Sequence, residues 1–335
     1  MQSYAECPQV LRDFLSYHES IKGQSRRTVS EYHLDLRMFL RFLTLMRREL
    51  PYNTPLDSID IKWIDTAVLN TVTSSEIFDF LSYLTNDRQN REGPNDAGIA
   101  AASRARKLSA IKALYKYLTV STKQISNNPV KDIEFPKIRR SLPKYLTLEE
   151  STALLKAVDG PNKNRDFAIL MLFLNCGIRR SELVGLNLTD VYEDRIRVVG
   201  KGNKERVVFF ADGCREAIDD YLAVRNGEKL PPEDKNALFI SRDNRRISVR
   251  GVQKMVDKKL LQAGLDASRY SPHKLRHTAA TLMLKNGVDT RALQEVLGHS
   301  NLNTTQIYTH LDNAALHEAA MANPIGRKTK EEIEE

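Results

Sequence analysis

The sequence predicts a mainly α-helical protein with a small antiparallel β-hairpin, divided into two or three domains. Apolar residues recur with a helical period through much of the N-terminal third. Alternating apolar residues flank a turn containing Gly and Asn near residues 195–209, which is typical of a β-hairpin. Pro129, Pro136 and Pro143 interrupt regular structure in the middle of the chain, where we place the domain boundary. With 335 residues, each domain is large enough for its own core.

The N-terminal part is expected to be a set of helices joined by polar loops. The apolar pattern from Val10 to Met46 predicts two helices with a turn at residues 23–28. A short anchored segment near Trp63, a helix at residues 75–84 and a strong helix at residues 101–118 follow. By themselves these helices are compatible with any helical hairpin protein.

Positive charge is concentrated between residues 101 and 146. This stretch has eleven Lys or Arg residues against Asp132 and Glu134, a net charge of +9, whereas the whole chain has +8. Such a concentration is the pattern expected of phosphate contacts, although a solvated basic face has the same composition. A basic linker between two lobes indicates a clamp that closes around a polyanion such as duplex DNA.

The C-terminal part shows clearer local signals. Thr147 and Glu150 form a predicted capping box at the start of a helix. A buried run at residues 167–174 precedes Arg179, which is expected to begin a helix, and Lys201 lies in the turn of the predicted hairpin. Further helices are expected at residues 214–224, 249–263 and 313–321, with a short strand at 237–240.

Residues 271–310 bring chemically active side chains together. Ser271 and Pro272 are suited to begin a helix that carries His273 and Arg276 on one face, because residues three apart are neighbours on a helix. Gly287 and Gly298 are suited to end this helix and the next, and Asp289 to cap the second. His299 and Tyr308 follow.

Each of these residues also has an ordinary structural interpretation. A histidine beside a glycine turn is usually a capping or packing residue, and a single lysine or arginine is usually solvated or ion-paired. His273 and His277 have the i, i+4 spacing of a zinc helix, but the residues between them are Lys-Leu-Arg rather than the Glu that such a site uses as a base. We therefore predict no metal and interpret His277 as a packing or supporting residue.

The ordered set of motifs resembles the tyrosine recombinase (phage integrase) family, most closely its bacterial Xer branch. The resemblance rests on GIRRSELVGL, GKGNKER, SPHKLRH and LGHSNLNTTQIYTH in this order. It implies six catalytic residues: Arg179, Lys201, His273, Arg276, His299 and the nucleophile Tyr308. One departure is Arg180, where an apolar residue is common, so the register of the first arginine is open; the spacing to Ser181 and Glu182 favours Arg179.

The implied chemistry suits these residue types. A tyrosine hydroxyl has an ordinary pKa near 10, so it needs help to attack at neutral pH. Two forked guanidinium groups can hold the non-bridging oxygens of a DNA phosphate, and the histidines can transfer or hydrogen-bond protons. The resemblance assigns protonation of the leaving 5′ oxygen to Lys201. A 3′-phosphotyrosyl link conserves the bond energy, so no ATP or other cofactor is expected, and no phosphate-binding loop motif is present.

The resemblance also implies a domain plan. It comprises a helical core-binding domain at residues 1–135, a basic linker at 136–146, a catalytic domain at 147–325 and a charged tail at 326–335. Expected DNA contacts are Arg26, Arg27, Arg104, Lys107, Lys112, Arg139 and Arg140. The tail either docks on a neighbouring protomer or folds back on its own domain.

The expected partner is a double-stranded DNA recombination site. The protein is expected to act there as a homotetramer or together with a second recombinase, with a DNA translocase as a possible activator. Resolution of chromosome dimers, integration or excision of a mobile element, and non-catalytic DNA binding on the same scaffold are the alternatives.

The cellular setting follows from cysteine and apolar content. Cys7, Cys176 and Cys214 are odd in number and widely spaced, which favours a reducing compartment. The first twenty residues contain acidic side chains and lack an apolar core, so no signal peptide is predicted. No apolar run is long enough to cross a membrane, and a cytoplasmic location is expected.

Overall fold

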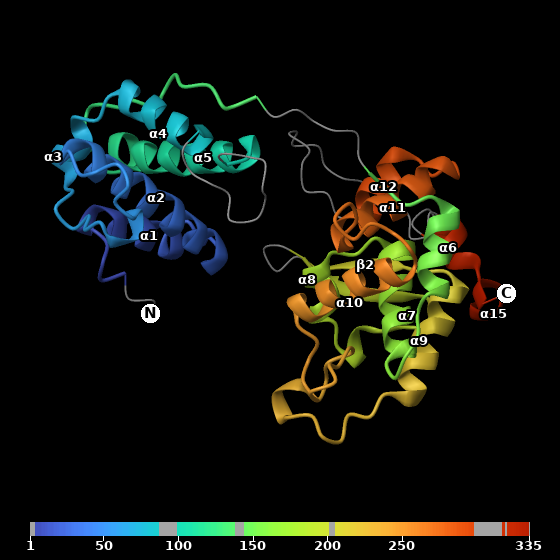
Figure 1. The fold of residues 1–335 in the computed structure, drawn as a ribbon. Helices are drawn as coiled ribbons and strands as arrows, with labels where there is room; N and C mark the ends of the chain where they lie inside the picture. The colour runs from blue at the N-terminus through green and yellow to red at the C-terminus, as the bar shows by residue number, and fades with distance from the viewer. Residues whose placement is uncertain are drawn as a thin grey trace. The chain divides into compact units, whose positions relative to one another are not determined.

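The computed structural model describes residues 4–86, 99–137, 144–200, 205–297, 317–318 and 320–334. The chain forms two compact units, residues 1–141 and 142–335. Both are mainly helical, as expected, and the second contains a two-stranded antiparallel sheet (Figure 1).

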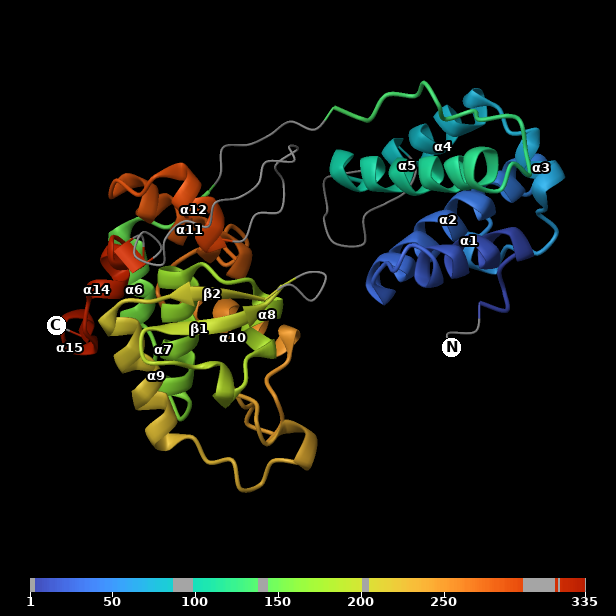
Figure 2. The same cartoon turned by 180° about the vertical axis from the view of Figure 1, so that it is seen from behind.

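The N-terminal unit is a helical cluster built around a long central helix, α2. Its helices are α1 (Gln9–Ser20), α2 (Arg26–Arg47), α3 (Thr66–Asn70), α4 (Ser74–Asn86) and α5 (Ala101–Lys116). A π-helical turn at Tyr117–Ser121 continues α5. Helices α1, α4 and α5 all pack against α2, as Figures 1 and 2 show.

Apolar faces at helical spacing explain this packing. Phe14 of α1, Phe39 and Leu40 of α2 and Phe80 of α4 are fully buried in one core. The turn before α2 is shorter than predicted, because Ser25 caps the helix by accepting a hydrogen bond from the backbone of Thr28 (3.2 Å). Local capping therefore brings the expected turn residues 26–28 into the first turn of α2.

The C-terminal unit places helices around a small hairpin. The helices are α6 (Leu148–Lys156), α7 (Lys163–Met171), α8 (Arg180–Gly185), α9 (Asp212–Val224), α10 (Val249–Gln262), α11 (Pro272–Lys285), α12 (Thr290–Leu297), α14 (Pro324–Arg327) and α15 (Lys330–Glu334). The strands are β1 (Arg195–Val199) and β2 (Glu205–Phe209) (Figure 2).

The predicted hairpin and capping box are confirmed. Strands β1 and β2 pair in an antiparallel register that sets Ile196 opposite Val208, both buried. Thr147 accepts a hydrogen bond from the Glu150 backbone (3.2 Å), and the Glu150 carboxylate accepts one from the Thr147 backbone (2.8 Å).

The predicted strand at residues 237–240 is wrong. Ala237 and Ile240 form only isolated bridges, with Asn187 and Arg246. The side chain of Arg225 donates to the carbonyls of Ala237 (2.6 Å) and Leu238 (3.1 Å). Because a side chain satisfies these carbonyls, no continuous ladder of backbone hydrogen bonds forms.

The end of the chain folds back on its own unit. Helix α14 packs against α9 and α6, and Ile325 and Ile333 are buried in the same core as α7. Asn323 donates to the carbonyls of Leu174 (2.8 Å) and Asn175 (3.1 Å). Of the two arrangements expected for the tail, this structure has the one within the same chain. In the described part of the chain, no helix is both long and apolar enough to cross a membrane.

Candidate active site

Arg179 lies between the end of a buried helix and the start of a helix at the surface. The buried run ends in a π-helical turn at Leu172–Cys176, followed by Gly177 in the left-handed region at φ 57°. A Cβ on Gly177 would lie 2.8 Å from Leu297 Cδ2 and 3.3 Å from Ala279 Cβ, so glycine serves both the turn and the close packing. The chain then emerges at Arg179, which precedes α8 as predicted.

A buried carboxylate, Glu182, holds Arg179 in place. Its oxygens accept hydrogen bonds from Arg179 Nη1 and from the Arg179 backbone, both at 2.8 Å. They also accept a bidentate pair from Arg206 at 2.7 and 2.9 Å. Burial acts to raise the pKa of Glu182, but the bonds from Arg206 and Arg179 outweigh it and hold the pKa below its ordinary value.

The supporting roles of Glu182 and Arg206 were not predicted. Arg206 lies opposite Val198 in the hairpin, on the same face as the buried Val208. A charged residue at an inward position of a strand was the signal available in the sequence. Its partner, Glu182, comes from α8, so the pairing depends on a contact between distant segments.

Arg276 is more deeply buried than Arg179 and Arg206. Only 4% of the residue is exposed, and its guanidinium donates to the carbonyls of Gly177 (2.7 Å) and Leu297. Burial, followed by the nearby charge of Arg179, lowers its pKa to about 10, so it remains charged at neutral pH. In the described part of the chain it forms no ion pair of its own. The result is a buried positive charge that favours a bound anion.

His273 and His277 form a contacting pair one turn apart on α11. Their Nε2 atoms are 3.2 Å apart, and the rings meet edge to face with centroids 4.6 Å apart. Partial burial lowers the pKa of both rings, and the neighbouring cation Arg276 lowers them further. A hydrogen bond between the two Nε2 atoms needs one of them to carry a proton and the other to be deprotonated. Two neutral rings meet this requirement, so the neutral form suits this contact.

The described residues thus bring three predicted catalytic positions together. Arg179 and Arg276 meet around Gly177 and Glu182, and His273 lies on the same helix as Arg276. Lys201, His299 and Tyr308 lie outside the described residues. The hairpin that brackets Lys201 is present, with Val199 paired to Glu205.

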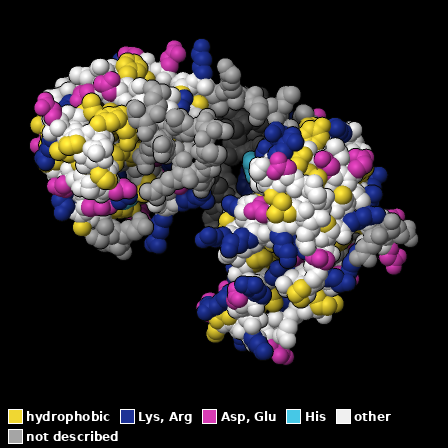
Figure 3. Space-filling model, viewed as in Figure 1, with side chains coloured by type: hydrophobic (Ala, Val, Ile, Leu, Met, Phe, Trp, Pro, Cys, Tyr) yellow, Lys and Arg dark blue, Asp and Glu magenta, His cyan; other side chains and the backbone are white. Residues whose placement is uncertain are grey.

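The predicted DNA contacts in the N-terminal unit differ in their exposure and in the groups that they contact. The Arg26 side chain is 96% exposed and Arg27 is exposed. Arg104 donates to the carbonyl of Ile99 (2.6 Å), and Lys112 lies over the ring of Phe135 at 5.2 Å. Arg139 and Arg140 lie outside the described residues. Figure 3 shows Lys and Arg side chains interspersed with Asp and Glu on the visible surface.

Lys107 is corrected as a candidate DNA contact. It is 5% exposed, and its ammonium lies 2.7 Å from the buried carboxylate of Asp35 in α2. Arg106 contacts the other oxygen of Asp35, also at 2.7 Å. Part of the basic face predicted for α5 is therefore neutralised by an acidic residue of the neighbouring helix, which no property of α5 alone indicates.

Comparison with known proteins identifies the family. The phage integrase family model matches residues 144–315. The chain is 46% identical over 322 residues to a protein named tyrosine recombinase XerC from Caldanaerobacter subterraneus subsp. tengcongensis, covering 96% of this chain and 88% of that one. It is 31% identical to tyrosine recombinase XerD from Halalkalibacterium halodurans, covering 92% and 95%.

Solved structures share the fold. The XerH site-specific recombinase bound to its difH substrate has a TM-score of 0.61 at 23% identity, covering 92% of this chain and 84% of that one. A lambda integrase tetramer bound to a Holliday junction has a TM-score of 0.62 at 18% identity, covering 90% and 79%. These structures show the shared fold, and the extent and identity of the sequence matches place the chain in the phage integrase family, as a site-specific tyrosine recombinase of the Xer type.

Proposed function

We propose that this recombinase cuts DNA through Tyr308. The Tyr308 hydroxyl oxygen forms a bond to the scissile phosphorus while the bond to the 5′ oxygen breaks. The 5′ oxygen takes a proton from Lys201 and leaves as a hydroxyl, and the 3′ end stays linked to the tyrosine. Attack by another 5′ hydroxyl reverses these steps and joins a new partner strand, so no external energy source is needed.

The buried charge of Arg276 is the observation that supports this proposal. Among the described residues its guanidinium is bonded only to carbonyls, and Arg179 is fixed nearby by Glu182. Two oriented guanidinium groups stabilise the negative charge that grows on the non-bridging oxygens during attack. The neutral His273, and His299 by resemblance, supply hydrogen bonds or accept the tyrosine proton.

A nicked DNA substrate that traps the covalent intermediate tests this assignment. Tyr308→Phe is expected to bind DNA with unchanged affinity and to form no covalent adduct, whereas the control Tyr270→Phe forms it at the normal rate. Arg276→Lys keeps the positive charge but loses the forked pair of guanidinium donors. We expect the rate of cleavage to fall about 100-fold to 1,000-fold. A covalent adduct in Tyr308→Phe would remove this tyrosine from the mechanism.

We further propose resolution of chromosome dimers in the cytoplasm as the biological role. The relatives named XerC and XerD, which match along most of their length, support it over integration of a mobile element. The active form is proposed to be four recombinase subunits on DNA, of one or two kinds, with a DNA translocase as activator. The basic linker at residues 136–146 is proposed to let the two units surround the duplex.

Sequencing of genomic DNA trapped covalently on the protein distinguishes the two roles. A single chromosomal site without neighbouring mobile-element genes is expected for dimer resolution. Enrichment of the ends of a mobile element would contradict it. Deleting candidate translocase genes in the same cells tests the activator, since trapping at the site should then fall.

A further inference from the structure

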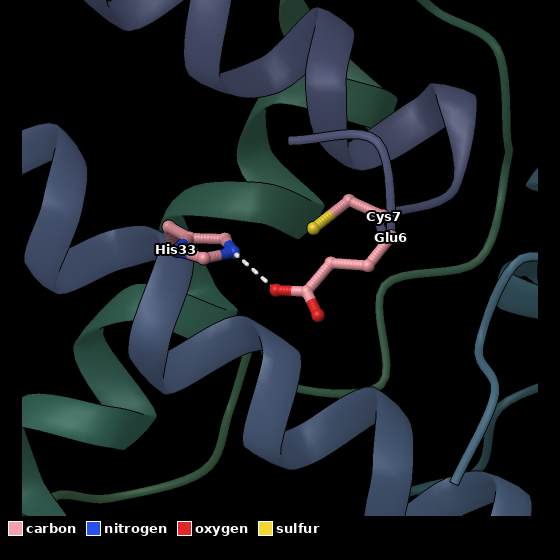
Figure 4. Close-up of side chains that lie close together, drawn as sticks. All are labelled: Glu6, Cys7 and His33. Carbon is pink, nitrogen blue, oxygen red and sulfur yellow. Dashed lines mark ion pairs between the residues drawn. The ribbon is translucent and has the colours of Figure 1, made fainter. Parts of the chain in front are cut away.

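A cluster of metal-binding side chains lies far from the catalytic residues in sequence, inside the N-terminal unit. Glu6 and Cys7, just before α1, meet His33 of α2 (Figure 4). One ligand atom from each residue lies within 4.8 Å of the other two. The Nε2 atom of His33 is 3.8 Å from a Glu6 carboxylate oxygen. No other such group of three is found in the described part of the chain.

The histidine of this cluster has an unused nitrogen. His33 Nε2 is shielded from solvent and has no hydrogen-bond partner among the described residues. The side chain is 12% exposed, and its ring packs against Tyr4 with centroids 4.7 Å apart. A buried polar atom without a partner carries an energetic cost, so a partner aimed at this nitrogen is to be expected.

We propose that Glu6, Cys7 and His33 bind a zinc-class divalent metal ion. Thiolate, imidazole and carboxylate are the ligands that zinc takes in proteins, whereas calcium and magnesium select oxygen. In a tetrahedral zinc site, ligand atoms are roughly 3.4 to 3.7 Å apart, given bond lengths of about 2.0 to 2.3 Å. Since the three atoms lie within 4.8 Å of one another, metal binding needs a contraction of about 1.4 Å at most. Cys7 gives its proton to solvent on binding, and water completes the coordination.

The surrounding charges are compatible with a bound cation. A Cys7 thiolate and the Glu6 carboxylate carry two negative charges toward a dication, and the pairing of Glu6 with Arg37 leaves one further positive charge beside the site. Arg37 donates to Glu6 Oε1 and Arg41 lies 3.9 Å from Oε2, while Arg41 is also paired with Asp57 at 2.7 Å. A carboxylate oxygen can accept such a hydrogen bond and bind a metal together, and outer hydrogen bonds of this kind orient metal ligands. Arg12 donates to the carbonyl of Cys7 (3.2 Å), not to its sulfur.

The expected effect of the metal is to link the segment before α1 to α2 and so to stabilise the folded N-terminal unit. Glu6 and Cys7 precede the first helix, and His33 lies in the central helix of the N-terminal unit. A ligand that binds only the folded form raises its stability in proportion to the logarithm of its concentration. This role is independent of the recombination chemistry proposed for Tyr308.

Cobalt binding to the metal-free, full-length protein tests the proposal. We expect one cobalt ion per chain with a thiolate-to-cobalt charge-transfer band, and displacement by zinc. Cys7→Ser should abolish the band, and Glu6→Gln and His33→Gln should each weaken binding at least tenfold. Zinc should raise the unfolding temperature of the wild type by several degrees, about 5 °C at a hundredfold excess over its Kd, and that of Cys7→Ser by none.

Cys214→Ser is the matched control, because it removes another buried thiol that is not in the cluster. It should keep the full band. Cobalt on the His273 and His277 pair gives no thiolate band, so it is not mistaken for the proposed site. If Cys7→Ser fails to fold by circular dichroism, weakened binding in His33→Gln decides in its place. A wild type with no band, or a band that survives in folded Cys7→Ser, overturns the proposal.

Discussion

At the scale of single residues, the site depends on how positive charges are compensated. The carboxylate of Glu182 accepts hydrogen bonds from two arginines, whereas Arg276 is bonded, within the described ranges, only to carbonyl oxygens. The resemblance to the tyrosine recombinase family predicted Arg179, His273 and Arg276, and their residue types suit the chemistry that it implies. It did not predict Glu182 or Arg206 as supports, since their pairing joins α8 to β2 and leaves no local pattern.

Glu182→Gln is therefore expected to impair both stability and cleavage. The amide cannot offset two guanidinium groups, so the free energy of unfolding should fall by about 3 kcal/mol. Covalent adduct formation should fall about 100-fold because Arg179 loses its fixed position. Denaturant unfolding and the nicked-substrate assay measure the two effects. Asp194→Asn breaks an exposed pair with Arg195 and should change stability by less than about 0.5 kcal/mol; an equal loss in both variants would contradict the argument.

The histidine pair predicts a pH dependence of stability. Because burial lowers the pKa of His273 and His277 in the folded state, the unfolded chain binds protons more readily. Their stabilising contribution is complete above the ordinary value of about 6.5 and is lost as the pH falls toward the folded pKa. In urea unfolding between pH 7 and pH 5, His277→Gln should lose less stability than the wild type. A steeper loss in the variant would show that the pair is not held neutral.

At the scale of elements, local signals predicted helices and turns well, and contacts between elements poorly. The helical periods, the hairpin and the Thr147 capping box are properties of neighbouring residues, and each is confirmed. The strand expected at residues 237–240 fails because Arg225, from α9, takes its carbonyls. Lys107 fails as a surface residue because Asp35 lies on the helix beside it.

The turn at Gly177 offers a prediction with a built-in control. Gly177→Ala meets both a left-handed φ and the close approach of Leu297, so we expect a loss of about 2 to 5 kcal/mol. Gly264→Ala has a similar φ of 71° but open space around its Cβ, so only about 1 to 2 kcal/mol should be lost. Denaturant unfolding measures both. Equal losses would mean that packing against Leu297 is not restrictive.

At the scale of the whole molecule, the position of the positive charge matters more than its amount. The basic stretch at residues 101–146 includes charges that are already paired, such as Lys107 and Arg106 with Asp35. Counting charges along the sequence therefore overestimates the surface offered to DNA. The residues of the basic linker remain candidates together with the exposed Arg26 and Arg27, and the contribution of the linker can be measured directly.

The salt dependence of DNA binding separates these two classes. Each phosphate contact contributes about 0.9 to the slope of log K against log salt concentration. Arg139→Ala with Arg140→Ala should lower the slope by about 2. Lys107→Met should leave it unchanged, because Arg106 still pairs with Asp35 and the lysine is not offered to solvent. A lower slope for Lys107→Met would restore it as a phosphate contact.

Two arginines of the site hold the last turn of α12 by hydrogen bonds. Arg276 donates to the carbonyl of Leu297, and Arg206 donates to the carbonyl of Val296 (3.4 Å). Two residues later the chain reaches His299, and then Tyr308. The arginines of the proposed phosphate clamp thus also hold the end of α12, which precedes the proposed nucleophile in the sequence. A substitution of Arg276 therefore removes a stabilising charge and also the hydrogen bond that holds the end of α12. The kinetic defect of such a variant is the combined effect of these two losses.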